Sequence, residues 1–365
     1  MFMKKLFLLL LLIFPITSFA QEASQEELFK ARVIEVIQEE EIVDETGTVK
    51  QQNLKLEGLE GSFKDKEVIF EGIGNFQVVS TQTYNIGDKV IISHNQDIEG
   101  DDVFFILDYD RSNPLLWLSI IFILSVLVVG RWKGLRSLIA LVASFFVILK
   151  FIVPQILSGA SPVLISVVGG IIILVFAVYL TQGVNKKAHI ANASLVLSLF
   201  FVALLSLWFT KLARLSGYSG EETIFLLEMG QGTLNLQGLL LAGILIGTLG
   251  VLDDVIVSQV STVEQLKRAN PELSNRQIYV RSLKVGIDHI TSMINTLFFA
   301  YAGASLPLLI LFTQSDVIGL NFSQVMNKEI ISTEIVRTLL GSIGIIFSIP
   351  IANYLASYFL KIKQD

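Results

Sequence analysis

Apolar runs long enough to cross a membrane dominate the chain from residue 114 onward. A helix of about 20 consecutive apolar residues spans the hydrocarbon core of a bilayer. Short polar junctions separate these runs, so the pattern predicts a polytopic α-helical membrane domain over residues 113–365. The expected seven spans lie near 114–130, 135–153, 163–181, 190–210, 236–258, 285–312 and 333–360.

Residues 21–112 follow a different pattern, in which apolar and polar positions alternate as they do in half-buried β-strands. Turn residues such as Gly47, Gly61 and Gly87 separate the alternating runs. The runs expected to form strands are 31–37, 67–70, 76–79, 89–92 and 103–107. The pattern predicts a small all-β domain, an OB-like barrel. A small β-sandwich is the alternative.

The first 20 residues have the three-part pattern of a secretory signal peptide. Lys4 and Lys5 precede an apolar core that runs from Leu6 to Ile13, and small residues end at Ala20. This core is short for a membrane span, which favours a cleaved signal over an uncleaved anchor. The sequence therefore predicts that the β domain is exported.

Basic residues occur at every second junction between the predicted spans, and such an excess marks the cytoplasmic side of membrane proteins. These residues are Arg131, Lys133, Arg136, Lys186, Lys187, Lys267, Arg268, Arg276, Arg281, Lys284, Lys361 and Lys363. The asymmetry predicts a multi-pass protein of the bacterial plasma membrane. Its N-terminal domain is expected outside and its C-terminus in the cytoplasm.

Composition supports the membrane setting and excludes other classes. Only 16% of the residues are charged, against about 25% in soluble domains. Residues 21–112 carry 21 Asp and Glu but 8 Lys and Arg, a net charge of −13, whereas residues 113–365 carry +5. An acidic domain does not attract nucleic acid, so the lipid bilayer is the expected partner. Without Cys there is no disulfide or zinc–thiolate site, and without a phosphate-binding loop direct NTP hydrolysis is not expected. No cofactor is expected.

Two adjacent carboxyls, Asp253 and Asp254, lie within the apolar run 236–258, near its inner end. Charged side chains are costly within a bilayer and normally face a protein interior or a wet cavity. One stripe of the predicted helix, with residues three or four apart, carries Gly243, Gly247, Gly250, Asp254 and Ser258. The glycines of this stripe predict close packing against another helix.

The next predicted span, 285–312, carries a second set of polar residues. They are Asp288, His289, Ser292, Asn295 and Thr296. Because consecutive spans run in opposite directions, Asp288 and His289 are expected at the level of Asp253 and Asp254. Two further polar residues, His189 and Asn192, open the fourth span at the same inner level.

Carboxyls and an imidazole at one level of a membrane suit a proton relay. Two neighbouring carboxyls in a low-dielectric site cannot both ionise at low cost, so the pair can bind and release a proton near neutral pH. Histidine titrates in the same range. The same donor atoms can also hold a divalent metal, and the residues do not decide between these roles. The structural alternative is that Asp253 or Asp254 only bonds a neighbouring helix.

Local spacing predicts two further details. Ser274 and Gln277 have the spacing of a capping box that starts a helix, just after Asn270 and Pro271 interrupt the inner link. Glu334 and Arg337 lie one turn apart in the last span, a spacing that favours an ion pair.

Several long motifs of the membrane domain resemble the YibE/F family of bacterial multispan proteins. They include Gly-Val-Leu-Asp-Asp-Val at 250–255 and Val-Gly-Ile-Asp-His-Ile at 285–290. Further matching segments are 238–244, 258–259, 295–297, 300–307 and 334–337. The resemblance covers most of residues 110–360, and it implies an architecture, with an exported β domain before a multispan body, more than an activity.

A weaker likeness is to the membrane core of SecD/SecF and RND permeases, in which an intramembrane Asp couples proton flow to work outside the membrane. On this likeness, Asp253 or Asp254 is the coupling carboxyl. The sequence departs from that pattern by two additional spans before the matched region and by the lack of a large porter domain.

Together these features predict an integral-membrane permease or export-associated protein, proton- or cation-coupled through Asp253 and Asp254. The alternative is a non-transporting scaffold whose β domain binds an envelope partner. An intramembrane aspartyl hydrolase would pair Asp253 or Asp254 with Asp288, but the Gly-x-Gly-Asp context of such proteases is missing, so no enzymatic activity is expected. A second family member or another copy of the chain is the expected protein partner.

Overall fold

The computed structural model describes residues 27–44, 47–74, 82–96, 100–218, 223, 225–226, 234–313, 319 and 321–361. The chain forms two compact units that divide between Ser125 and Val126, a β domain and a helical body. The predicted signal peptide, 1–20, and the predicted strand 76–79 lie outside the described residues.

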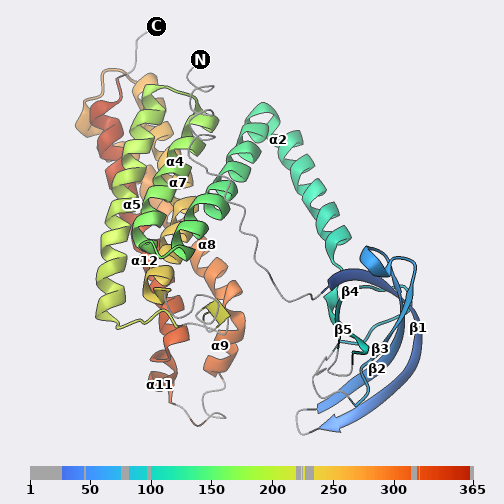
Figure 1. Cartoon of the computed structure of the whole chain (residues 1–365). Coiled ribbons are helices and arrows are strands. Elements are labelled where there is room, and N and C mark those ends of the chain that lie inside the picture. The colour runs from blue at the N-terminus through green and yellow to red at the C-terminus, as the bar shows by residue number, and fades with distance from the viewer. Residues whose placement is uncertain are drawn as a thin grey trace. The chain divides into compact units, whose positions relative to one another are not determined.

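An antiparallel five-stranded sheet forms the β domain, in the order β3-β2-β1-β4-β5 (Figure 1). The strands are β1 Glu27–Asp44, β2 Gly47–Gly58, β3 Glu67–Glu71, β4 Lys89–Gln96 and β5 Asp102–Tyr109. The edge strands β3 and β5 also contact each other, so the sheet curls into a half-barrel. The predicted small β domain is confirmed, and β2 is a strand that the sequence analysis missed.

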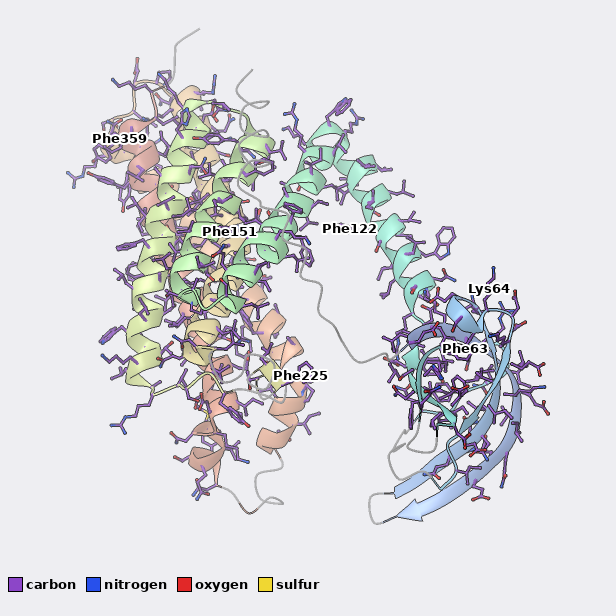
Figure 2. The ribbon with its side chains drawn as sticks, in the orientation of Figure 1. Phe63, Lys64, Phe122, Phe151, Phe225 and Phe359 are labelled. Carbon is purple, nitrogen blue, oxygen red and sulfur yellow. The ribbon has the colours of Figure 1, made fainter. Side chains whose placement is uncertain are left out.

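Alternation along the strands builds the core of the β domain. Phe29 and Val33 of β1 and Leu54 of β2 point inward and are fully buried. Phe63, in the short helical turn η1 (Gly61–Phe63), stacks on Phe29 with 4.8 Å between ring centroids. Phe63, which Figure 2 labels, also meets Phe104 of β5 edge-on at 5.3 Å, so the turn packs on the core.

Glu27, the first residue of β1, holds this turn in place. Its carboxylate accepts hydrogen bonds from the hydroxyl of Ser62 at 2.6 Å and from the backbone N–H of Ser62 at 2.9 Å. The hydrogen bond from the Ser62 hydroxyl, and to a smaller extent the one from its backbone N–H, hold the pKa of Glu27 below its usual range. Both bonds stabilise the ionised carboxylate.

The helical body continues from a long helix, α2, whose first residues, Ser112–Ser125, belong to the unit of the β domain. Its elements are α2 Ser112–Val147, η2 Ile148–Ile152, α3 Val153–Leu157, α4 Pro162–Gln182, α5 Lys186–Leu212, α7 Leu236–Ala269, α8 Asn275–Ala304, α9 Leu306–Thr313, α11 Phe322–Met326 and α12 Glu329–Phe359. Each of the seven predicted spans falls on helix.

Among the described residues, five helical segments are long and apolar enough to cross a membrane: Ser112–Leu157, Pro162–Gln182, Lys186–Leu212, Leu236–Ala269 and Glu329–Phe359. The first is 46 residues long and contains two predicted spans. The predicted span 285–312 falls on α8 and α9, and α8 is not one of the five. The fold is therefore a multispan membrane protein with a β domain, and the number of crossings stays a prediction.

The long first segment is interrupted where the sequence places a basic junction. Arg131 has a φ of +48° inside α2, a backbone conformation that side chains other than glycine rarely adopt. Three residues later, a Cβ on Gly134 would collide with the backbone carbonyl of Val126. The backbone can therefore close up at the break only because residue 134 has no side chain.

Helix α7 is the centre of the helical body and contacts α4, α5, α8 and α12 (Figure 1). Leu245, Leu249 and Leu252 of α7 are buried in the largest apolar cluster, together with Leu199 of α5. Burying such side chains is worth about 1.5–3 kcal/mol each in water. In a bilayer, close packing replaces that driving force.

Both ends of the bundle are tied by polar contacts. At the end predicted to face outside, the Glu329 carboxylate accepts hydrogen bonds from the backbone N–H groups of Ser216, Gly217 and Tyr218 at 2.7, 2.8 and 3.2 Å. At the other end, the Lys267 ammonium donates to the carbonyls of Ser357 and Leu360 at 2.7 and 2.8 Å. A cation suits the last carbonyls of a helix, because these carry partial negative charge.

Helix α8 runs antiparallel to α7, and one glycine sets how closely they approach. A Cβ on Gly286 would lie 2.5 Å from Cγ2 of Ile349 and 3.0 Å from Oε1 of Gln259. Farther along, a Cβ on Gly247 of α7 would lie 3.5 Å from the Tyr301 hydroxyl of α8. Gly286 thus packs α8 directly on α7 and α12.

The local predictions for this region are confirmed. α7 ends at Ala269, and Ser274 and Gln277 form both bonds of the capping box that starts α8. The Nη1 of Arg337 lies 2.6 Å from the Oε1 of Glu334, as the i,i+3 spacing predicts.

We expect the β domain to lose stability in acid partly through Glu27. Its pKa is lower in the folded than in the unfolded state, so its contribution is present above about pH 4.3 and is lost as the pH falls through the folded pKa. Glu27→Gln should flatten the fall in protection below that pH. Hydrogen exchange of β1 and residues 59–66 in the full chain, corrected for intrinsic rates, measures this. Glu60→Gln, an exposed carboxyl on the same loop, is the control; equal slopes for both variants would contradict the prediction.

Gly286→Ala should destabilise the helical body by about 1–3 kcal/mol, because its methyl group would overlap Ile349 in a packed core. Thermal unfolding of the purified protein in detergent measures the change. Gly243→Ala is the matched control, since a Cβ there has nothing within 4 Å and alanine favours the helix. If both variants unfold at the same temperature, Gly286 does not set the approach of α8.

Candidate functional site

The central helix α7 carries the two adjacent carboxyls. Asn235 caps its start by accepting from the backbone N–H of Gly238 at 2.8 Å. One side of the helix is then buried continuously from Gly238 to Val263. Asp253 and Asp254 lie in the half of α7 that leads to the inner link, as predicted.

The two carboxyls have different surroundings because consecutive residues point about 100° apart on a helix. Asp253 is partly buried, and its Oδ1 is buried without a hydrogen-bond partner among the residues that the structure describes. Asp253 follows Leu249 by one turn, and Leu249 packs over Gly170 of α4, so Asp253 lies on the α4 side of α7. Asp254 is exposed.

The glycine stripe of α7 is an open face of the helix. Gly243, Gly247 and Gly250 are exposed, and a Cβ on Gly243 or Gly250 would meet no atom of the described residues within 4 Å. Among the described residues, a Cβ on Gly247 does have a neighbour, the hydroxyl of Tyr301. The close helix contact expected at this stripe is therefore not made at Gly243 or Gly250 within the described part of this chain.

The polar residues of α8 lie mainly on its outer side. Asp288, Ser292, Asn295 and Thr296 are exposed, and His289 is partly buried. Gly286 faces α7 and α12, and Asp288 follows it by two residues, about 200° of helical rotation. Asp288 thus points away from the helices that Gly286 contacts.

The four expected titrating residues share a level but not a face. Gly286 lies opposite Gln259 and Tyr301 opposite Gly247, and along their helices Asp253 and Asp254, and Asp288 and His289, fall between these two levels. Across the described ranges, however, no three His, Asp or Glu side chains come close enough to hold a metal ion. Within the described residues, Asp254 lies on the open side of α7 and Asp288 points away from α7, so these two carboxyls do not face each other. The place of a residue along a span sets its depth, whereas its direction around the helix depends on packing.

The polar residues that were expected to support the site, Ser258, His189 and Asn192, lie in different surroundings. Ser258 is partly buried on the open side of α7, and its carbonyl accepts from the hydroxyl of Thr262 at 3.1 Å. His189 is exposed, with Nδ1 2.7 Å from the Tyr179 hydroxyl. Asn192 is buried, and neither of its amide atoms has a partner in the described segments. His189 is therefore engaged with α4, while Asn192 keeps unused hydrogen-bonding capacity.

Two buried carboxamides at the α7–α8–α12 contact were not singled out from the sequence. Gln259 is 1% exposed and Asn353 is fully buried. The Oε1 of Gln259 and both amide atoms of Asn353 lack partners among the described residues. A Cβ on Gly286 would lie 3.0 Å from that Oε1 and 3.4 Å from the Nδ2 of Asn353. Asn353 follows a largely apolar run in the last predicted span. A carboxamide at such a position was the signal in the sequence that could have identified it.

A second polar group lies nearer the end predicted to face outside. The Glu334–Arg337 pair receives a further contact from the Ser305 hydroxyl, 3.4 Å from the Oε2 of Glu334. The Nε of Arg337 is buried without a partner in the part of the chain that is described. Arg337 and Glu334 are electrostatic neighbours of Tyr301, whose hydroxyl lies beside Gly247. Polar groups thus border the open side of α7 toward this end.

Three comparisons with known proteins bear on the family of this chain. A search of curated proteins and a search of solved structures found no match. The family model of the YibE/F-like proteins matches residues 118–362, which include α7, α8 and α12 with all the candidate residues. The chain therefore belongs to the YibE/F-like protein family.

Proposed function

We propose that this protein is a permease or export-associated protein whose work is coupled to the movement of protons or cations through Asp253 and Asp254. Asp253 carries the proposal. Its carboxyl lies inside an apolar helix at the centre of the body, with Oδ1 buried and unpartnered within the described residues. A carboxyl placed there for structure alone would be expected to have a bonding partner.

The ability of Asp253 to exchange a proton or a cation depends on the adjacent carboxyl of Asp254. Two carboxyls on consecutive residues in a low-dielectric setting cannot both carry charge cheaply, so they exchange a proton or share a cation. Asp254 faces the open side of α7, and Asp253 faces α4. The pair therefore joins a buried position to an exposed one.

The open side of α7 supplies a route along the helix. Ser258 lies one turn from Asp254 toward the inner link, and the glycines at 243, 247 and 250 leave space in the other direction. The Tyr301 hydroxyl borders this space at Gly247. Hydroxyls and carboxyls spaced along a small-residue lane can carry protons through bound water.

Transport fits the arrangement better than hydrolysis. An aspartyl hydrolase needs two carboxyls that face each other across a bond, whereas Asp288 lies on the side of α8 turned away from α7. We propose that the protein performs no covalent chemistry. The non-transporting scaffold remains the alternative, and the β domain, with a core of its own, is the part that would bind an envelope partner.

The proposed orientation places the β domain outside the plasma membrane and the C-terminus in the cytoplasm. Arg276, Arg281 and Lys284 on the first turns of α8 are exposed, which suits the cytoplasmic surface. Asp253 and Asp254 would then lie in the inner half of the membrane.

Proton flux into liposomes tests the coupling. The purified full chain is reconstituted around a pH-sensitive dye, and a pH gradient is imposed. We expect Asp253→Asn and Asp254→Asn to reduce flux to that of protein-free vesicles, because neither amide can bind and release a proton. Abundance and thermal unfolding should stay at the wild-type level.

Glu264→Gln is the matched control, since this carboxyl lies on the same helix but is paired with Lys187 and Arg268 at 3.4 and 3.1 Å. It should leave flux unchanged. Full flux in both Asn variants, with function lost on deletion of residues 21–112, would support the scaffold. Loss of the folded protein in the Asn variants would support a structural role.

A further inference from the structure

Helices α8 and α12 share a row of polar side chains toward the end of the bundle that is predicted to face outside. On α12, Glu334, Arg337 and Gly341 follow each other at spacings of three and four, so they lie on one side of that helix. On α8, the Ser305 hydroxyl donates to the Oε2 of Glu334 at 3.4 Å. A Cβ on Gly341 would lie 3.9 Å from the hydroxyl oxygen of Tyr301, which is one turn from Ser305. Glu334, Arg337, Ser305 and Tyr301 are called the outer row below.

The outer row reaches the open side of α7 through the Tyr301 hydroxyl. A Cβ on Gly247 would lie 3.5 Å from that hydroxyl oxygen, so the hydroxyl lies between α7 and α12. Gly247 and Asp254 are seven residues apart, which is about two turns, and they point in nearly the same direction. Asp254 is exposed, and so is Gly250 between them. The outer row therefore ends on the side of α7 that carries Asp254.

Both carboxylate oxygens of Glu334 already accept from donors in the outer row. The Nη1 of Arg337 lies 2.6 Å from Oε1, and the Ser305 hydroxyl binds Oε2. The side chains of Arg337 and Glu334 are only 29% and 22% exposed. A guanidinium has no lone pair to offer to a metal ion, and hard metal cations need about six oxygen ligands. A proton needs a single oxygen, and the hydroxyls of Ser305 and Tyr301 both donate and accept.

We infer that Glu334 is the group that exchanges protons with the outer side, and that the coupled ion is therefore the proton. This inference rests on the proposed function, which allows either a proton or another cation at Asp253 and Asp254. It adds a second carboxyl, on another helix, and a direction of access from outside.

The inferred step moves only a proton. A water molecule or hydronium ion on the outer side gives a proton to the Glu334 carboxylate, which forms an O–H bond. Tyr301 is an electrostatic neighbour of Glu334 and Arg337. Its hydroxyl oxygen accepts a proton as it gives up its own toward Asp254, so Tyr301 ends the step unchanged. Water on the exposed side of α7 can complete the route past Gly250.

Chemical modification of the wild-type full chain in liposomes shows whether Glu334 binds protons. Dicyclohexylcarbodiimide reacts with membrane carboxyls that are protonated, and mass spectrometry of the peptides locates the product. Modification of Glu334 should rise as the pH of the medium is lowered, and should exceed that of Glu264 several-fold. Glu264 is the matched carboxyl, because it is also ion-paired, to Lys187 and Arg268. No product at Glu334 at any pH would overturn the inference, because a purely structural ion pair stays ionised.

Proton flux into the dye-loaded liposomes tests the same group by substitution. Glu334→Gln keeps the size and an acceptor oxygen but cannot bind and release a proton, so flux should fall at least about tenfold. Thermal unfolding should match the wild type, and Glu264→Gln should keep full flux. Tyr301→Phe should lower flux several-fold, whereas Tyr279→Phe, at the other end of α8, should not.

The outcomes separate this inference from the proposed function. Full proton flux in Glu334→Gln, with flux lost in Asp254→Asn, would overturn the inference and leave the proposed function standing. The reverse result would support Glu334 and overturn coupling through Asp253 and Asp254. Wild-type flux of Na⁺ or K⁺ without a response of the pH dye would overturn the inference, because the coupled ion would not be a proton.

Discussion

The structure depends on one constraint, that a bilayer offers no water to pair with polar groups. The helices meet it largely by bonding inward: the hydroxyl of Thr248 donates to the carbonyl of Ile244, and Ser194 and Ser342 do the same to Ile190 and Thr338. Charged residues at the helix ends pair across the bundle, as Lys267 does with the end of α12. The buried Oδ1 of Asp253 is one of several buried polar atoms, those of Asn192 and Asn353 among them, that have no partner among the described residues. Asp253 differs from Asn192 and Asn353 in that it can ionise, and ionisable residues within a membrane are commonly functional.

Much of the fold could be predicted from the sequence because its signals are local. Apolar run lengths located the helices, and the Ser274–Gln277 and Glu334–Arg337 contacts follow from spacings of three residues. Strand β2 was missed because its inward row includes Gln52. The amide of Gln52 bonds with the backbone of Tyr84, 32 residues away, and with the carboxylate of Glu39 on β1. No pattern within a few residues of Gln52 shows such partners.

The candidate site could be predicted in depth but not in rotation. Depth follows from counting residues along a span. Rotation is decided by tertiary contacts, here by Gly286 against Ile349 and by Leu249 over Gly170. These contacts turn Asp253 toward α4 and leave Asp288 outside. The Tyr179 hydroxyl beside His189 is also a tertiary contact, which links the ends of neighbouring helices.

The carboxylate of Glu329 has a consequence for how the protein is made. It fills a pocket of three backbone N–H groups that follow α5, yet it comes 113 residues after Ser216. Those N–H groups are synthesised long before their acceptor, and they stay without it until the last helix enters the membrane. The junction after α5 therefore closes late, and a truncated chain keeps it open.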